Sequence, residues 1–224
     1  MSLAYRFTVL IIKIYIQITC RLHADELKRF PAKGPYIVIT NHTGQIEVPV
    51  FFAFLQPRKM TAWAKVESWD NWFLNWVFNL WGIIPVRRGE ADTSALRKAM
   101  EALDNGYFFG IAPEGHRNKN GRLRRAFPGT VLLAVRSGIP ILPIAHWGGE
   151  VYLKNLKHFK RTDFYINVGK PFRLNVEGVK MSKDVRQQIV DEMMLRVAEL
   201  MPKEYHGEYA NMRFDGQTFT ETIE

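Results

Sequence analysis

Short apolar runs separated by helical patterns most constrain what this 224-residue chain can fold into. Residues 36–40 (Tyr-Ile-Val-Ile-Thr) are bounded by Gly34-Pro35 and Asn41, which is typical of a buried strand. Similar apolar runs occupy residues 60–64, 83–86, 107–111, 141–145 and 164–168. Helical patterns lie between them at residues 48–55, 63–81, 93–103, 130–137 and 182–200. This alternation predicts an α/β fold whose largely parallel or mixed central sheet is flanked by helices.

The composition is that of one globular domain, with 47% hydrophobic and 24% charged residues. It excludes a disordered tail, and the single cysteine, Cys20, excludes an intrachain disulfide scaffold and a thiolate zinc cluster. No repeat or change in composition marks a second domain. We therefore predict an N-terminal helix over residues 1–22, one α/β domain over residues 23–202 and a polar C-terminal appendage over residues 203–224.

The most apolar stretch, residues 7–20, opens the chain but does not predict a membrane-spanning helix or a signal peptide. Lys13 and Gln17 interrupt it, whereas a spanning helix needs about 20 predominantly apolar residues. Together with Arg6 and Arg21, these residues recur in steps of 7, 4 and 4, which makes one narrow polar stripe on a helix. The helix either packs onto the domain with its polar stripe exposed to solvent or lies in the plane of a membrane interface.

A second aromatic-rich segment favours the membrane alternative. Five of the six tryptophans lie within residues 63–81. One helix face is expected to carry Trp69, Trp72, Phe73, Trp76, Val77 and Leu80. Such a stripe is either core or an aromatic belt at headgroup depth. With a net charge of +9, the chain is predicted to attach to a membrane through an amphipathic N-terminal helix and this segment.

Three clusters of polar residues follow predicted strands, where open α/β sheets place their ligand sites. Asn41, His42 and Glu47 follow the first strand, and Arg87 and Arg88 follow the third. The strand over residues 107–111 is followed by Glu114, Gly115 and Arg117.

His42 and Glu47 are the candidate catalytic pair. Their five-residue spacing puts them on different faces of a continuous helix, so they meet only if His42 lies in a loop and Glu47 on the helix that follows. Asn41 and Thr43 are suitable N-cap residues for that boundary. A carboxylate on one imidazole nitrogen leaves the other nitrogen as a base toward a hydroxyl. No serine neighbours His42, which favours direct deprotonation of a substrate alcohol.

Residues 116–136 contain no acidic side chain, and their basic residues include Arg117, Lys119, Arg122, Arg124 and Arg125. This basic segment binds either anionic lipid or a substrate phosphate. Glu114, in a Pro-Glu-Gly turn among these arginines, either holds an acceptor hydroxyl or positions an arginine.

Taken together, four blocks resemble the PlsC-type glycerolipid acyltransferases over about residues 35–150. They are Asn41-His42-x4-acid, Gly82-Ile83-x3-Arg87-Arg88, Pro113-Glu114-Gly115-x-Arg117 and Ile139-Pro140-Ile-Leu-Pro143-Ile, in that order. The resemblance implies that His42 is the base and Glu47 its partner. It also implies that the second and third blocks bind a glycerol-phosphate acceptor, so the expected substrate-binding residues are Asn41, Arg87, Arg88, Glu114, Gly115 and Arg117.

The resemblance implies an O-acyltransferase of phospholipid biosynthesis, peripheral or monotopic on the cytoplasmic face of a membrane. Acyl-CoA or acyl-carrier protein would donate the acyl group to a lysophosphatidate-like acceptor, with no metal or other cofactor.

The sequence departs from the family pattern at Glu47, where aspartate is usual, at Ala112 and His116, and at Phe127-Pro128. These departures leave open another acceptor, such as a different lysophospholipid, a glycolipid or an aminolipid. A non-catalytic basic lipid-binding module is the alternative class. No nucleic acid is expected, since no zinc-finger, RRM or KH motif is present.

Overall fold

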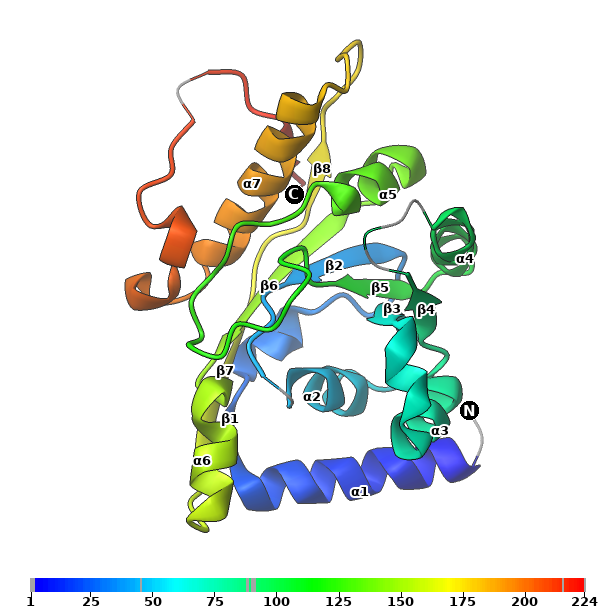
Figure 1. Ribbon diagram of the computed structural model, residues 1–224, viewed down its shortest axis with the longest axis vertical. Helices are drawn as coiled ribbons and strands as arrows, with labels where there is room; N and C mark the ends of the chain where they lie inside the picture. The colour runs from blue at the N-terminus through cyan, green and yellow to red at the C-terminus, as the bar shows by residue number, and fades with distance from the viewer. Residues whose placement is uncertain (1–2, 45, 88, 90–91, 215, 224) are drawn as a thin grey trace.

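The computed structural model describes residues 3–44, 46–87, 89, 92–214 and 216–223, which form a sheet with helices on both faces (Figure 1). The strands in chain order are β1 (Cys20–His23), β2 (Tyr36–Thr40), β3 (Met60–Lys65), β4 (Ile84–Val86), β5 (Phe108–Ile111), β6 (Ile141–Trp147), β7 (Thr162–Val168), β8 (Phe172–Leu174) and β9 (Thr220–Thr222). The helices are α1 (Leu3–Thr19), α2 (Glu47–Phe54), α3 (Trp72–Trp81), α4 (Thr93–Asp104), α5 (Gly129–Ser137), α6 (Tyr152–Lys157) and α7 (Lys183–Ala198).

The main run of the sheet has the strand order β1-β7-β6-β2-β5-β3-β4. Strand β2 lies parallel to both β5 and β6, and β3 lies parallel to β5 and β4. Strand β7 runs antiparallel to β6, and β8 pairs antiparallel with β6 and β9. The sheet is therefore mixed, as predicted, with a parallel centre whose strands end at one edge.

Two hydrophobic cores lie on opposite faces of the sheet because successive strand side chains point to opposite sides. Ile37 and Ile39 of β2 pack into a core formed with α4, α5 and α7. Val38, between them, packs into the core formed with α1, α2, α3 and α6. Figure 1 shows α2 enclosed between the sheet and α1, which accounts for its nearly continuous burial.

The helices begin and end where the sequence supplies capping groups. Asn71, Asp92 and Ser182 accept backbone N–H bonds at the N-termini of α3, α4 and α7. Gly82 and Gly138 adopt the left-handed conformation that ends α3 and α5. These local signals explain why most of the predicted elements lie within a few residues of their observed positions.

Three strands and one helix escaped the sequence prediction. Strand β1 follows α1 directly, so the N-terminal helix ends at Thr19 and not at residue 22. Strands β8 and β9 have three residues each, and α6 has six, which is too short for a periodic pattern. The segment after Pro202 is not the polar appendage that its composition predicts: Tyr209 and Phe219 are buried, and β9 extends the sheet.

The tryptophan-rich segment is not one helix. Trp63 lies on β3 and packs edge-on against Phe109, and Trp69 lies in a 3-10 helix before α3. Within α3, Trp81 is buried against Phe52, whereas Trp72 is 80% and Trp76 49% exposed. The predicted stripe is therefore divided between core and surface.

Helix α1 also serves two environments. Its buried side includes Val9 and Ile16, and Ile16 belongs to the core that also contains α2. An exposed apolar stripe on α1 consists of Leu3, Phe7, Leu10, Ile11, Ile14 and Ile18, each at least 48% exposed. Among the described residues, no helix is both long and apolar enough to cross a membrane.

Candidate active site

The candidate site forms where β2 and β5 end, because these neighbouring parallel strands deliver their following loops to the same edge. The β2 loop carries His42 and leads into α2, whose first residue is Glu47. The β5 loop carries Glu114. The sheet topology thus brings together two sequence blocks that lie about 70 residues apart.

His42 and Glu47 meet in the loop-and-helix arrangement that their spacing predicts. The His42 Nδ1 donates to Glu47 Oε1 over 2.7 Å, with side-chain exposures of 16% and 3%. The Gly44 N–H donates to the same oxygen over 3.1 Å. Among the described residues no group bonds the Nε2 of His42. With the proton on Nδ1, this Nε2 is an accessible base.

Glu47 is held as a buried carboxylate. Its burial opposes ionisation, but the hydrogen bond from His42 outweighs this and lowers the pKa of Glu47 to about 2. Its second oxygen, Oε2, has no hydrogen-bond partner within the described part of the chain. The shortest hydrogen bond of the Glu47 carboxylate is therefore the one with His42.

The backbone of His42 is fixed from both sides by the third sequence block. Its N–H donates to Glu114 Oε1 over 2.9 Å, and its carbonyl accepts the Asn118 N–H over 2.8 Å. The other oxygen of Glu114 accepts the Arg124 N–H over 2.9 Å. Each oxygen of Glu114 is thus bonded to a backbone N–H, and among the described residues no arginine side chain forms an ion pair with it. It ties the His42 loop to the basic segment.

Burial raises the pKa of Glu114 to about 7, although the two backbone N–H bonds favour its ionised form. Protonation puts an O–H donor on one oxygen and makes that oxygen a weaker acceptor of a backbone N–H. The anchorage of the His42 loop is therefore coupled to the protonation of one buried carboxyl group.

Asn41 has a structural role that neither the N-cap prediction nor the substrate-binding prediction anticipates. Its fully buried amide donates to the His146 carbonyl over 2.7 Å and accepts the His146 N–H over 3.0 Å. The Asn41 carbonyl accepts a bond from His146 Nε2 over 2.8 Å. The N-cap of α2 is Ile46, because the loop after Asn41 is longer than the sequence suggested.

His146 is the residue of this site that the sequence analysis missed. It is fully buried at the end of β6, where burial lowers its pKa, so its imidazole is neutral. Three hydrogen bonds to Asn41 join the ends of β2 and β6 directly behind His42. A histidine inside the apolar run of β6 was the available signal, but the predicted strand ended one residue before it.

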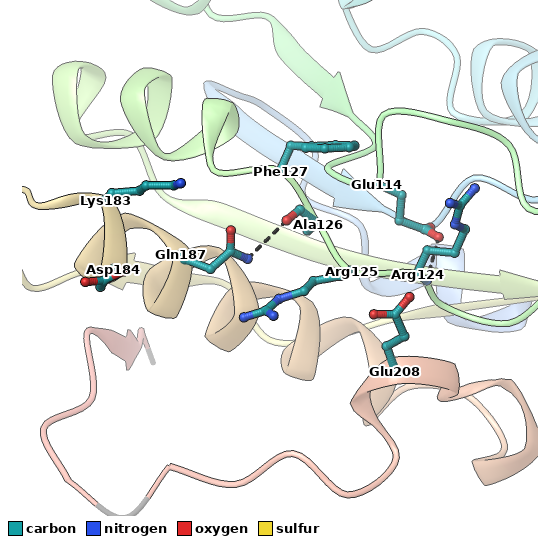
Figure 2. Close-up of a pocket in the computed structure, with 9 residues that line it drawn as sticks. All are labelled: Glu114, Arg124, Arg125, Ala126, Phe127, Lys183, Asp184, Gln187 and Glu208. Atoms are coloured by element: carbon teal, nitrogen blue, oxygen red, sulfur yellow. Dashed lines mark hydrogen bonds between the residues drawn. The ribbon is translucent and has the colours of Figure 1, made fainter. Parts of the chain in front are cut away.

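A cavity of about 420 Å³ adjoins this site and has Glu114 in its wall (Figure 2). Its basic lining residues are Arg124, Arg125 and Lys183, and Phe127 covers one side. Arg125 pairs with the buried Asp191 over 3.3 Å, and Gln187 donates to the Ala126 carbonyl over 3.1 Å. These contacts order part of the basic segment against α7 and give the cavity a defined wall.

The other predicted site residues take different places. Gly115 has φ of +69°, and a Cβ there would approach the Phe127 ring to 3.0 Å, so this glycine serves the turn. Arg117 is exposed on the same loop. Arg87 follows β4, three strands from β2 and roughly 14 Å along the sheet, and it lines a separate cavity. Arg88 lies outside the described residues.

In the described part, no three His, Cys, Asp or Glu side chains form a metal cluster.

Comparison with known proteins identifies the family. A family model for acyltransferases matches residues 21–147. A 1-acyl-sn-glycerol-3-phosphate acyltransferase from Borreliella burgdorferi is 26% identical over 173 residues, which cover 74% of this chain and 69% of the relative. A chloroplastic one from Brassica napus, BAT2, is 25% identical over 125 residues, 54% of this chain but only 36% of the relative.

A solved structure shows the same fold. The 1-acyl-sn-glycerophosphate acyltransferase PlsC from Thermotoga maritima has a TM-score of 0.66 at 20% identity, covering 95% of this chain and 81% of that one. The fold and the matched residues define an acyltransferase enzyme. The chain belongs to the acyltransferase family, and its resemblance to the PlsC type is confirmed.

The raised pKa of Glu114 predicts a pH-dependent stability. Between about 4.5 and about 7 the folded protein holds a proton on Glu114 that the unfolded chain has lost. This stabilisation is therefore complete below pH 4.5 and is lost as the pH rises through 7, by roughly 3 kcal/mol. We expect Glu114→Gln to remove this pH dependence. Denaturant unfolding of both proteins across this range measures it, and equal slopes would contradict the prediction.

Proposed function

We propose that this acyltransferase moves a fatty acyl group from a thioester, acyl-CoA or acyl-carrier protein, to the hydroxyl of a lysophosphatidate-like acceptor, giving phosphatidate for phospholipid biosynthesis. The observation that carries the proposal is the His42–Glu47 pair with an accessible Nε2. The names of the relatives support the acceptor class.

In the proposed reaction, His42 Nε2 takes the proton of the acceptor hydroxyl as its oxygen attacks the thioester carbonyl. The imidazolium that forms is stabilised by Glu47 through the 2.7 Å hydrogen bond. Collapse of the tetrahedral intermediate breaks the carbon–sulfur bond, and His42 returns the proton to the departing thiolate. The products are an ester and a free thiol, so one proton is taken and one is given back.

The phosphate of the acceptor is proposed to lie against the basic segment. Glu114 ties the Arg124 backbone to the His42 loop, and Arg124, Arg125 and Lys183 line the cavity that Glu114 borders. Arginine binds phosphate in a bidentate geometry, which would also orient the acceptor hydroxyl. This proposal makes no use of a metal or cofactor.

Attachment to the cytoplasmic face of a membrane completes the proposal. The exposed apolar stripe of α1 and the exposed Trp72, Phe73 and Trp76 of α3 support an interfacial position, since soluble surfaces rarely gather such patches. The single buried cysteine suits a reducing compartment.

The function is tested by thiol release from long-chain acyl-CoA with a panel of acceptors: lysophosphatidate, other lysophospholipids, a glycolipid and an aminolipid. We expect lysophosphatidate to be preferred, and His42→Ala to lower turnover by about 10²- to 10⁴-fold without loss of folding. His23→Ala, on an exposed histidine of β1, is the control. Preference for another acceptor would reject the substrate assignment, and activity of His42→Ala within threefold of wild type would reject the mechanism.

Glu47 is expected to act through charge. Glu47→Gln retains an oxygen that can accept from His42 and Gly44, but it cannot stabilise the imidazolium. We therefore expect turnover to fall by at least tenfold while the acceptor KM changes little. Glu47→Asp, which keeps the charge, should retain more activity than Glu47→Gln. Similar kinetics for the two variants would instead mark Glu47 as a structural helix-start residue.

Membrane attachment is expected to depend on the α1 stripe. Replacing Phe7, Ile14 and Ile18 with alanine keeps helix propensity but removes apolar area, so vesicle affinity should fall at least tenfold. Salt should release only the electrostatic part of the binding. Leu132→Ala, on an exposed residue of α5, is the control in a vesicle sedimentation assay. Complete release of the wild type by salt alone would show that the stripe does not insert.

A further inference from the structure

We infer that a third element binds the membrane: the α6 tip, defined here as residues 153–160, which we propose inserts Phe159 and places three lysines against anionic headgroups. This inference rests on the proposed membrane function and extends it to a segment that the sequence analysis did not single out.

The first observation is the conformation of Phe159. Its side chain is 100% exposed, and its φ is +54°. The Phe159 N–H donates to the Leu156 carbonyl and the Lys160 N–H to the Asn155 carbonyl, which is the hydrogen-bond pattern of a glycine-terminated helix. A bulky residue in this left-handed position is strained, and here its ring gains no packing in return. The fold alone therefore gives no reason for phenylalanine at this site.

The second observation concerns the exposed side chains that neighbour Phe159 in the α6 tip. Leu153 is 48% and Leu156 36% exposed on α6. The exposed basic residues of the tip are Lys154, Lys157 and Lys160. Residues 151–161 contain no acidic side chain. The nearest acids are engaged elsewhere: Glu150 accepts from the Tyr205 hydroxyl, and Asp163 pairs with Arg21 and His23. Exposed apolar side chains with neighbouring lysines can bind an anionic lipid surface, because the apolar groups insert and the lysines contact the headgroups.

The third observation is continuity with the α1 stripe. The Tyr152 hydroxyl donates to the Tyr15 hydroxyl of α1 over 2.7 Å. From the loop after α6, Arg161 donates to the Gln17 carbonyl over 2.8 Å and also to the Cys20 carbonyl. Figure 1 shows the C-terminal end of α6 level with α1 on the lower edge of the molecule. These bonds hold the tip beside the C-terminal end of the stripe.

Glycine is the informative substitution at Phe159, because it relieves the backbone strain while removing the ring. We expect Phe159→Gly to melt at the wild-type temperature or higher, yet to bind anionic vesicles about tenfold more weakly. Leu132→Ala should bind as wild type does. A ring that served the fold would give the opposite stability change, with vesicle binding unaltered.

The lysines are tested separately. Each basic residue near an anionic surface contributes about fivefold in affinity, so Lys154, Lys157 and Lys160 changed together to glutamine should weaken binding by about 100-fold. The loss should appear on phosphatidylglycerol vesicles and be small on phosphatidylcholine vesicles. Arg136, Lys170 and Lys180 changed to glutamine remove the same charge on α5 and beside β8, at the opposite end of the molecule in Figure 1. These control residues should have little effect.

Insertion is measured directly with an environment-sensitive dye on Phe159→Cys. The native Cys20 is 1% exposed and burial raises the pKa of its thiol, so labelling is selective. We expect a blue shift and quenching by spin-labelled lipid at residue 159, and neither at a matched Leu132→Cys. A dye that stays in water while the protein is bound would overturn the inference.

The outcomes separate this inference from the proposed function. If the wild-type protein does not bind vesicles, both the proposed membrane attachment and the role of the α6 tip are rejected. If the wild type binds and the tip variants bind equally well, only the role of the tip is rejected. Normal vesicle binding by the tip variants, with activity lost only when acyl-carrier protein is the donor, would mark the tip as a protein-docking surface and also overturn the inference. Activity on a dispersed short-chain acceptor should be unchanged in every tip variant.

Discussion

The arrangement of the candidate active site depends on the two backbone hydrogen bonds that the Glu114 carboxylate accepts. With one oxygen on the His42 N–H and the other on the Arg124 N–H, it joins the loop that carries His42 to the segment that carries the basic residues. Neither loop belongs to a helix or strand at that point, so no regular hydrogen-bond ladder would hold them. Because burial raises its pKa to about 7, the protonation of this junction changes near neutral pH. Asn41 and His146 provide a second junction from the opposite side, through three hydrogen bonds that do not require an ionised group.

The sequence could predict the central strands and the meeting of His42 with Glu47, because each rests on local information. Apolar runs locate β2, β5 and β6, and a five-residue spacing allows only a loop followed by a helix. It could not predict what Glu114 and Asn41 contact, since both bind backbone groups of residues that are distant along the chain. A backbone N–H is present at every residue except proline, so no sequence pattern marks the one that a buried side chain will bind.

The same limit explains the errors at the two ends of the chain. Strands β1 and β9 are short and carry polar residues, and they are stabilised by pairing with β7 and β8 rather than by their own pattern. Tyr209 lies in a polar segment, but it is buried because its hydroxyl accepts the Ala126 N–H and donates to Asp191. The tryptophans show the complementary case: their density was informative, but which of them face the core was decided by β3 and the 3-10 helix that precede α3.

The structure also relates the surface to the chemistry. Helix α2 begins at Glu47 and packs between the sheet and α1 (Figure 1). Gln56, just beyond α2, donates to the Tyr5 hydroxyl of α1, and Lys13 of α1 lies 5.7 Å from the centre of the Phe54 ring. Helix α1, which carries the exposed apolar stripe on one side, is thus fixed on its other side to the helix that begins at Glu47. If α1 lies in the interface, the depth of His42 relative to the lipid surface is set by side-chain packing and not by a flexible linker. A contact at the α6 tip, tied to the other end of α1, would fix the remaining tilt of the domain. Under the proposed function, the hydroxyl of a membrane-borne acceptor would then meet His42 at a defined height, an orientation that an enzyme free of the membrane would have to achieve by binding energy alone.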